Sequence, residues 1–339
     1  MGRISIKNKN KILILGVEST AHTFGVSIID SKKGILSDIK QAYVAPPSSG
    51  IHPREASRHH SEIASEIVGK SLELSKIKLN DIDAIAYSAG PGLGPCLKVG
   101  GVTARTLSSY LNKPLIAVNH AVGHIELAAN LTNAKDPIVL LATGGHTLIS
   151  AHNNKRWRIF GETLDATLGQ VLDQFGRTIG LSSPSGPKIE ELANKGEKYI
   201  ELPYTVKGND VSLSGTLTAV KKLYYEGIRI EDLAYSLQEN IFAMVVETCE
   251  RALSFLEKDE ILLTGGVAAN KRLQSMLNET CDRFGISLHT IPKKYSGDCG
   301  AQIAWTGLLG YLCNKQITPK EAKVTQSWRL NEVDIPWRN

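Results

Sequence analysis

KILILGV, at residues 11–17, is the stretch on which the fold depends: a mostly apolar run that ends at the turn-prone Glu-Ser-Thr (18–20). Its length and its lack of alternation predict a strand buried on both faces. FGVSIID (24–30) and residues 35–45 follow as two more extended segments, joined by the polar Ser-Lys-Lys-Gly. A long helical stretch then covers 56–76. The chain therefore opens with three strands and one helix.

The second half of the chain repeats this order. PIVLLAT (137–143) is a buried strand that ends in Gly-Gly, and residues 147–152 and 156–161 supply two more strands. Helical sequence runs from Ala166 to Ile179. Each half later adds a strand, a glycine-rich turn and a helix. These additions begin with DAIAYSAGPGLG (83–94) in the first half and EILLTGGVAAN (260–270) in the second.

A duplicated pattern of strands and helices predicts two related α/β domains with a cleft between them. The polar, turn-prone segment NLTNAKD (130–136) is the expected junction. It gives a first domain at 1–133, which carries a histidine pair, and a second at 134–339, which carries most of the glycine-rich turns. Two domains also agree with the length of 339 residues, which exceeds the size at which a single core usually keeps growing.

The composition is ordinary for a globular protein, with 42% hydrophobic residues, 22% charged residues and a formal net charge of +5. This charge permits an anionic partner without requiring one. The five cysteines form no CxxC pair, which argues against a disulfide framework or a zinc ribbon and favours a reducing compartment. No apolar run approaches a membrane span, and the basic N-terminus lacks a signal core. We expect a cytoplasmic protein without a membrane partner.

Three predicted strands end in small residues, at 88–92, 143–145 and 264–266. Glycine lets the backbone approach a ligand and turn its amides toward anionic oxygens. A tight strand-to-helix turn explains each of them singly, but two matching Thr-Gly-Gly turns in a duplicated chain favour phosphate binding. The chain contains no GxxxxGK[ST] string and no strand-linked GxGxxG with a downstream acid. A P-loop is therefore excluded, and a dinucleotide-binding fold is disfavoured.

The segment Asn-His-Ala-Val-Gly-His-Ile-Glu (119–126) follows the apolar strand PLIAV and is predicted to be helical. His120 and His124 lie four apart, so both imidazoles share one helix face and can bind one metal ion. A pair of ordinary helix-surface or helix-cap histidines is the alternative. A zinc peptidase is not supported, because Ala121 stands where its general-base glutamate would be. Asp298, just before a predicted helix start, is a candidate third ligand.

Several longer strings occur in the order seen in one family, and together they cover roughly residues 11–337. The chain closely resembles the TsaD family of tRNA threonylcarbamoyltransferases, in its archaeal and eukaryotic branch, whose members are the catalytic subunits of the KEOPS complex. The strings that carry this resemblance are HAVGH (120–124), ATGGHT (142–147), GETLD (161–165), SGPKIEELA (185–193), GGVAAN (265–270) and GDCGAQIA (297–304), with GVESTAHTFGVSI (16–28), GIHPREASRHH (50–60) and KGEKYIELPYTVKGNDVSLSG (195–215) as marks of the branch.

The resemblance implies the actin–hexokinase–chaperone (ASKHA) fold with a nucleotide cleft between two related domains. It implies one divalent metal ion, iron(II) before zinc, held by His120, His124 and Asp298. It also implies an adenine nucleotide in the cleft, as threonylcarbamoyl-AMP, ATP or AMP. The residues implied to contact this nucleotide are Leu141, Ala142, Thr143, Gly144, Gly145, Asp173, Gly186, Glu190 and Asn270. Asp173 and Glu190 suit the ribose hydroxyls, since carboxylates accept strong hydrogen bonds. No residue is assigned as a catalytic acid or base.

The sequence departs from the archaeal pattern at a few positions. Leu141 stands where the archaeal proteins usually have a tyrosine that can approach the metal, and His146 and Cys299 replace the usual asparagines. Leu141 and His146 agree instead with the bacterial pattern. A tyrosine ligand is therefore excluded. The string PSGP (184–187) replaces the commoner PGGP and retains Gly186.

The implied reaction moves a threonylcarbamoyl group from its adenylate to the adenosine next to the anticodon, in tRNAs that read codons beginning with A. The implied partners are tRNA and the other KEOPS subunits, including a small kinase-like subunit and a small dimerising subunit. An unstacked loop adenosine is the expected target, because base edges in an RNA duplex are poorly accessible. The alternatives are an ATPase or kinase on the same fold, a metalloprotease, which the missing glutamate disfavours, and a scaffolding subunit without activity.

Overall fold

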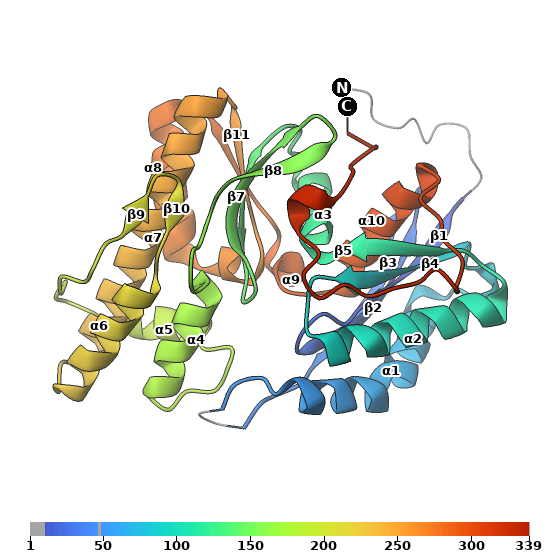
Figure 1. Ribbon diagram of the computed structural model, residues 1–339, viewed down its shortest axis with the longest axis horizontal. Coiled ribbons are helices and arrows are strands. Elements are labelled where there is room, and N and C mark those ends of the chain that lie inside the picture. Colours follow the sequence, from blue (N-terminus) through green and yellow to red (C-terminus); the bar gives the residue numbers. More distant parts are fainter. Residues whose placement is uncertain (1–10, 47–48, 339) are drawn as a thin grey trace.

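The computed structural model describes residues 11–46 and 49–338. Its first sheet has the strand order β3-β2-β1-β4-β5 (Figure 1). β1 pairs antiparallel with β2 and parallel with β4, and β4 pairs parallel with β5. Every residue of β1 is buried, as its continuous apolar sequence predicts. The bounds of these strands are β1 (Leu13–Glu18), β2 (Thr23–Asp30), β3 (Gly34–Ala42), β4 (Ala84–Gly90) and β5 (Leu115–Asn119).

The second sheet has the same topology, in the order β8-β7-β6-β11-β12. β6 pairs antiparallel with β7 and parallel with β11, as β1 does with β2 and β4. The predicted repeat of three strands, with a further strand added later, is therefore confirmed in both sheets. The bounds here are β6 (Ile138–Ala142), β7 (Thr147–Asn153), β8 (Arg156–Glu162), β11 (Glu260–Thr264) and β12 (Ser287–Thr290).

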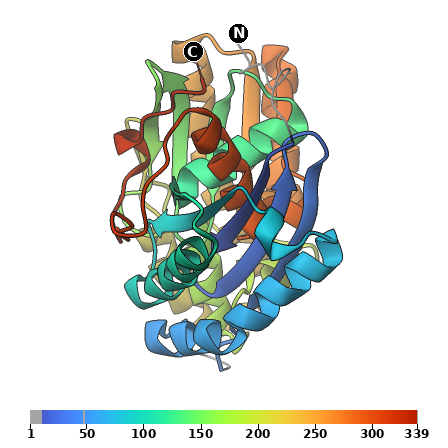
Figure 2. The ribbon, with the colours of Figure 1, turned by 90° about the vertical axis from the view of Figure 1, so that its right-hand side faces the viewer.

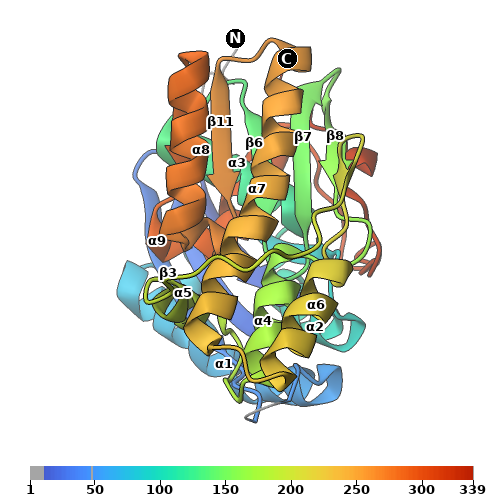
Figure 3. The ribbon, with the colours of Figure 1, turned by 90° about the vertical axis from the view of Figure 1, so that its left-hand side faces the viewer.

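Helices cover both faces of each sheet. α1 and α2 lie side by side on one face of the first sheet (Figure 2), and α10 lies on its other face. α3 packs on one face of the second sheet, and α7 and α8 cover the other (Figure 3). Both sheets are thus central layers, which explains their apolar strands. These helices are α1 (Pro53–Ser75), α2 (Gly94–Leu111), α3 (His120–Thr132), α7 (Ile230–Leu256), α8 (Lys271–Phe284) and α10 (Gly300–Leu312).

Between β8 and α7 the chain forms a smaller group of elements below the second sheet (Figure 1). Its helix α4 packs on α5 and α6, and these two pack on α7. Short turns of helix join the strands of the second half to α8 and α10. These elements are α4 (Leu168–Thr178), α5 (Gly186–Ala193), β9 (Val206–Lys207), β10 (Asp210–Val211), α6 (Ser214–Tyr225), η3 (Gly266–Ala269) and α9 (Lys293–Ser296), with η2 (Leu79–Asp81) and η4 (Leu330–Glu332) elsewhere.

The chain returns to the first sheet after β12. α10 crosses β1 and β2 at very short range because a glycine of β1 faces the backbone of α10 and a glycine of α10 faces the backbone of β2. A Cβ atom built on Gly16 of β1 would lie 2.3 Å from the amide nitrogen of Ala304, and one on Gly300 would lie 2.4 Å from the amide nitrogen of Ser27. The boundary expected near residue 133 stays a prediction, but helix α10, from the second half of the sequence, belongs spatially to the first sheet.

Residues 313–338 then run along both halves of the molecule. The amide of Thr325 donates to the carbonyl of Ala89 at 2.7 Å. Farther along, Arg338 donates to the buried carboxylate of Glu126 in α3 at 2.9 and 3.0 Å. This terminal segment therefore ties the end of β4 to α3. Among the described residues, no helix is both long and apolar enough to cross a membrane.

Gly16→Ala should destabilise the protein by about 1–3 kcal/mol, because the added methyl group would overlap the α10 backbone, which a side-chain rotation cannot relieve. Urea denaturation measures the effect. Gly69→Ala is the matched control: a Cβ at this exposed position of α1 meets nothing within 4 Å, so the helix should gain up to about 1 kcal/mol. Equal stability of the Gly16 variant and the parent would contradict the close packing of α10.

Candidate metal centre and nucleotide cleft

His120 and His124 lie in the first turns of α3, directly after β5. The helix begins there because the side chain of Asn119 caps it, accepting hydrogen bonds from the amides of Ala121 at 3.0 Å and Val122 at 3.2 Å. The two imidazoles stand edge to face with their centroids 4.6 Å apart. The predicted helical spacing is thus realised, and both rings point to the same side of the helix.

Asp298 meets this pair from the far end of the sequence. Its Oδ1 atom lies 3.2 Å from Nε2 of His124 and 3.5 Å from Nε2 of His120. Two side chains of β3 hold the segment that carries it. Asp38 accepts a hydrogen bond from the amide of Ala301, and Lys40 donates one to the carbonyl of Asp298, each at 3.0 Å. The structure therefore brings together the three residues predicted as metal ligands.

The donor set of this triad fits a divalent transition metal ion. One atom from each of His120, His124 and Asp298 lies within 4.8 Å of the other two. Two imidazole nitrogens and one carboxylate oxygen suit both iron and zinc, so the residues themselves do not select between these metals. Both histidines are buried, and the Asp298 side chain is 15% exposed. Access to the centre is therefore from the side of Asp298.

The charges of the triad depend on one another. Burial alone would lower the pKa of His120, but the carboxylates of Glu18 and Asp298 outweigh it and raise that pKa to about 9. Burial lowers the pKa of His124. Burial opposes ionisation of Asp298 as well, yet the two histidines bring its pKa far below the usual range. A metal ion that bound Nε2 of His120 would displace a proton from it, so the affinity of the site for metal should fall as the pH falls.

The two Thr-Gly-Gly turns lie side by side at the ends of the parallel strands β6 and β11. Gly265 has φ +98°, and a Cβ there would lie 2.3 Å from the carbonyl oxygen of Ala142, so only glycine fits at this contact. Thr264 connects the second turn to the triad, since its hydroxyl donates to the carbonyl of His124 at 3.3 Å. The turn at 88–92 is covered instead by residues 325–326.

Of the residues predicted to contact the nucleotide at the first Thr-Gly-Gly turn, only some are exposed at the surface. The side chains of Leu141 and Ala142 lie in the core and are fully buried, whereas Gly144 and Gly145 are exposed. The amide of Gly145 already donates to Oγ1 of Thr143 at 3.0 Å, so this turn is held by its own threonine. Within the described residues the amide of Gly144 has no such partner. It is the better placed of the two to meet an anion.

His146 completes this turn, and the charges of the triad residues affect its pKa. Its side chain is largely buried, and Nδ1 has no hydrogen-bond partner among the residues that the structure describes. Burial, followed by the neighbouring His120 and His124, lowers the pKa of His146 to about 4. His146 is therefore a neutral imidazole, which an asparagine could replace without a change of charge.

The other predicted nucleotide contacts lie around the same turns, and three of them also hold helices in place. Oδ1 of Asp173 accepts from the amide of Ser185, next to Gly186 at the start of α5, at 2.6 Å. Oε1 of Glu190 accepts from the amide of Lys271 at 2.6 Å. Asn270 caps α8. Their part in nucleotide binding stays a prediction, whereas their role in joining α4, α5 and α8 is structural.

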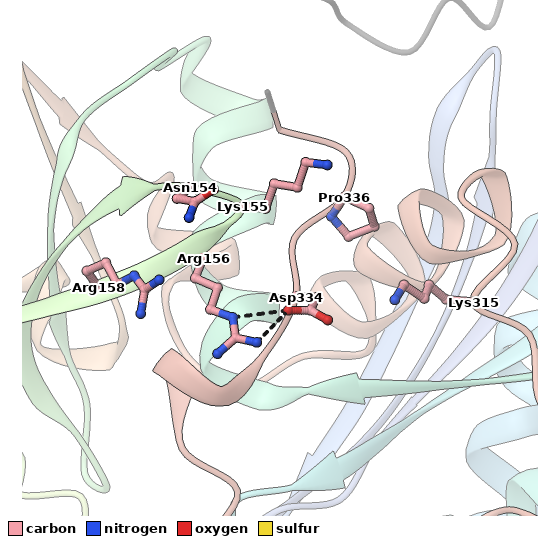
Figure 4. A pocket seen from close by; sticks show the side chains of 7 residues that line it. All are labelled: Asn154, Lys155, Arg156, Arg158, Lys315, Asp334 and Pro336. Carbon is pink, nitrogen blue, oxygen red and sulfur yellow. Dashed lines mark hydrogen bonds and ion pairs between the residues drawn. The ribbon is translucent and has the colours of Figure 1, made fainter.

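A basic cavity of about 400 Å³ lies apart from these residues, between the β7–β8 hairpin and the chain end (Figure 4). The guanidinium of Arg156 forms a two-point ion pair with Asp334, with Nε and a terminal nitrogen 3.0 and 2.9 Å from Oδ1. None of the predicted site residues lines it. Its lining residues are Asn154, Lys155, Arg156, Arg158, Lys315, Asp334 and Pro336.

Sequence reasoning missed Glu18, which is completely buried at the end of β1 and contacts His120. The sequence contained a signal for it, because a buried carboxylate at the end of a fully apolar strand needs a hydrogen-bonding or charged partner. It lay in the very stretch that predicts the fold.

Comparison with known proteins identifies close relatives over nearly the whole chain. A family model described as "TsaD: tRNA N6-adenosine threonylcarbamoyltransferase" matches residues 34–305. A protein named tRNA N6-adenosine threonylcarbamoyltransferase from Caldivirga maquilingensis is 46% identical, covering 96% of this chain and 98% of its own. One of the same name from Archaeoglobus fulgidus is 45% identical, with 96% and 100% covered.

A longer relative, from Methanothermobacter thermautotrophicus, is named a probable bifunctional tRNA threonylcarbamoyladenosine biosynthesis protein. It is 46% identical, and the match covers 96% of this chain but 61% of that protein. Among solved structures, HypF of T. kodakarensis superposes with a TM-score of 0.64 at 16% identity, over 92% of this chain and 49% of its own. Component A of the Acidaminococcus fermentans (R)-2-hydroxyglutaryl-CoA dehydratase gives 0.58 at 16%, over 90% and 99%. These two likenesses show the ASKHA fold alone.

Asn270→Ala should cost about 1 kcal/mol of stability whatever its role in binding, because the side chain accepts from the amides of Arg272 and Leu273 at the start of α8. Thermal or urea unfolding of the ligand-free protein measures this cost. Asn278→Ala, at an exposed position of the same helix, is the control and should stay within about 0.5 kcal/mol of the parent. If Asn270→Ala lost as little stability as Asn278→Ala, the helix cap would be dispensable.

Proposed function

The chain belongs to the TsaD family, and on that premise we propose how its cleft serves a tRNA N6-adenosine threonylcarbamoyltransferase. The activity is that of the family: an acyl transfer to the N6 atom of a tRNA adenosine. The observation that carries the proposal is the convergence of His120, His124 and Asp298 beside two adjacent Thr-Gly-Gly turns. A metal centre and an anion-binding edge thus share one site.

His120, His124 and Asp298 would hold one divalent ion, iron(II) before zinc. Bound there, such an ion supplies Lewis-acid polarisation of a carbonyl group. The protein's own residues would place the nucleotide part of the donor. The exposed turn at Gly144 and Gly145 would face the phosphate, and Asp173 and Glu190, with Gly186 between them, would accept hydrogen bonds from the ribose.

The donor in this proposal is threonylcarbamoyl-AMP. The exocyclic amine of the adenosine next to the anticodon attacks the carbamoyl carbon, and a new carbon–nitrogen bond forms. The bond from that carbon to the phosphate oxygen breaks, AMP leaves, and the amine passes one proton to water. The stated chemistry requires no general-base glutamate, which agrees with Ala121 after the first histidine and with the hydrogen bonds that Glu126 accepts from Trp157 and Arg338.

The further partners follow from the same premise. We propose that the chain works with the other KEOPS subunits, including a small kinase-like subunit and a small dimerising subunit, in the cytoplasm. Support comes from the bifunctional relatives, which carry additional chain: the match covers only 61% and 60% of their length. The competing activities, ATP hydrolysis or phosphorylation and proteolysis, are separate outcomes of the assay below.

His124→Ala and Asp298→Ala should each remove bound metal and abolish transfer, although the two residues lie 174 positions apart. Each variant loses one of three protein ligands. Elemental analysis measures the metal. Incubation with threonylcarbamoyl-AMP, tRNA and the two small subunits, followed by mass spectrometry of the digested tRNA, measures the transfer.

His59→Ala is the matched control, because this partly exposed histidine of α1 contacts Gln41 and His60 and no member of the triad. It should keep both metal and transfer. Full metal content in either ligand variant would contradict the proposed centre. ATP hydrolysis or peptide cleavage by the parent without any modified adenosine would favour a competing function.

Asp173→Asn should weaken AMP binding at least several-fold and leave the metal content unchanged. The amide oxygen can still accept from Ser185, so α5 stays in place, while the negative charge offered to the ribose is lost. Isothermal calorimetry measures the affinity. An unchanged affinity for AMP would remove Asp173 from the nucleotide site.

A further inference from the structure

The carboxylate of Glu18 contacts the ring nitrogen of His120 that faces away from Asp298. Oε2 of Glu18 lies 3.0 Å from Nδ1 of His120, while Nε2 of the same ring faces Asp298. His124 has no equivalent contact, since its Nδ1 lacks a hydrogen-bond partner among the described residues. The two histidines of the triad are therefore held differently, and only His120 is backed by a buried charge.

The hydrogen bonds around Glu18 determine which nitrogen of His120 carries a hydrogen. Both the amide and the hydroxyl of Thr20 donate to Oε1 of Glu18 at 2.6 Å. The hydroxyl hydrogen of Thr20 is thus committed, and its oxygen, 3.3 Å from Nδ1, can only accept from the ring. A lone pair on Nδ1 would face this oxygen and the carboxylate together. Because the carboxylate of Glu18, 3.0 Å away, can only accept, we assign the ring hydrogen to Nδ1.

Gln302 of α10 contacts both Glu18 and His120. Its Nε2 lies 3.3 Å from Oε2 of Glu18, to which it donates, and 3.1 Å from Nδ1 of His120. Glu18, which is 0% exposed, thus receives hydrogen bonds from Thr20, Gln302 and His120. A buried carboxylate is expensive to retain unless such donors compensate for its lost hydration. Thr20 and Gln302 supply part of that compensation, and the His120 ring supplies the rest.

We propose that Glu18 is a positioning residue of the metal centre: it holds the hydrogen of His120 on Nδ1 and so directs the lone pair of Nε2 toward Asp298. The inference rests on the proposed metal site. A carboxylate behind a ligating imidazole fixes the ring orientation and strengthens the nitrogen as a donor, and loss of such a partner lowers metal affinity 10- to 100-fold.

Glu18→Gln tests this assignment with almost no change of shape. A glutamine has one oxygen where the glutamate has two, so it can accept from Thr20 or from the His120 ring, but not from both. Zinc ions serve as the probe, and competition with a chromophoric chelator gives their affinity for the full chain. We expect the variant to bind zinc 10- to 100-fold more weakly than the parent.

A second measurement reports on the hydrogen itself. In the zinc-loaded parent, nitrogen–proton NMR correlation should show an exchange-protected Nδ1–H of His120, assigned by its absence from His120→Ala, at the low field typical of a bond to a carboxylate. This signal should shift or disappear in Glu18→Gln. A purely structural glutamate would lower the melting temperature without moving either the zinc affinity or this signal.

Glu126→Gln is the matched control. Glu126 is also a buried carboxylate and lies on α3, but it bonds Trp157 and Arg338 rather than a member of the triad, so this variant should keep the parent's zinc affinity. Equal affinity of Glu18→Gln and the parent, or a zinc-loaded parent whose His120 carries no Nδ1–H, would overturn the role of Glu18. The NMR test uses the parent alone, so it can be made even if Glu18→Gln does not fold. Failure of the parent itself to bind zinc or iron would instead overturn the metal centre of the proposed function.

Discussion

Helix α10 lies almost directly on the backbone of β1 and β2, and the candidate site depends on this contact. Gly16 and Gly300 have no side chains to separate the two elements. Asp298 lies two residues before the helix, so the packing that buries α10 also places this carboxylate beside His120 and His124. A bulkier residue at either glycine would move the third ligand together with the helix. Core packing and site geometry are thus one constraint.

The same packing concentrates charge in a place that water reaches poorly. Two carboxylates, Glu18 and Asp298, flank one imidazole, and their combined field outweighs the effect of burial on His120. Without a metal ion, a proton on that ring balances part of the negative charge. A divalent cation can take over this balance from the Asp298 side, whereas Glu18 keeps the hydrogen on the opposite nitrogen. In the proposed centre, a divalent cation would thus replace the proton on Nε2 of His120.

The residues proposed to bind the nucleotide also have structural roles. Asp173, Glu190 and Asn270 each hold the beginning of a helix or the segment before it. The helix starts that they hold are those of α5 and α8, so a ligand that engaged these side chains would act directly on how α4, α5 and α8 meet. A variant that removes one of them therefore disturbs a helix start as well as any contact with a bound ligand, and a charge-only substitution separates the two effects.

Local pattern in the sequence was sufficient for the strands, the duplicated topology and the helical histidine pair, because alternation, apolar runs and helical spacing act between near neighbours. The string matches added the family and the expected ligand set. Tertiary structure alone decided that Glu18 backs His120, a contact across 102 positions, and that Leu141 and Ala142 are enclosed in the core. It also decided that α10 returns to the first sheet. Such contacts depend on which surfaces meet once the sheets are covered, and no spacing along the chain encodes that.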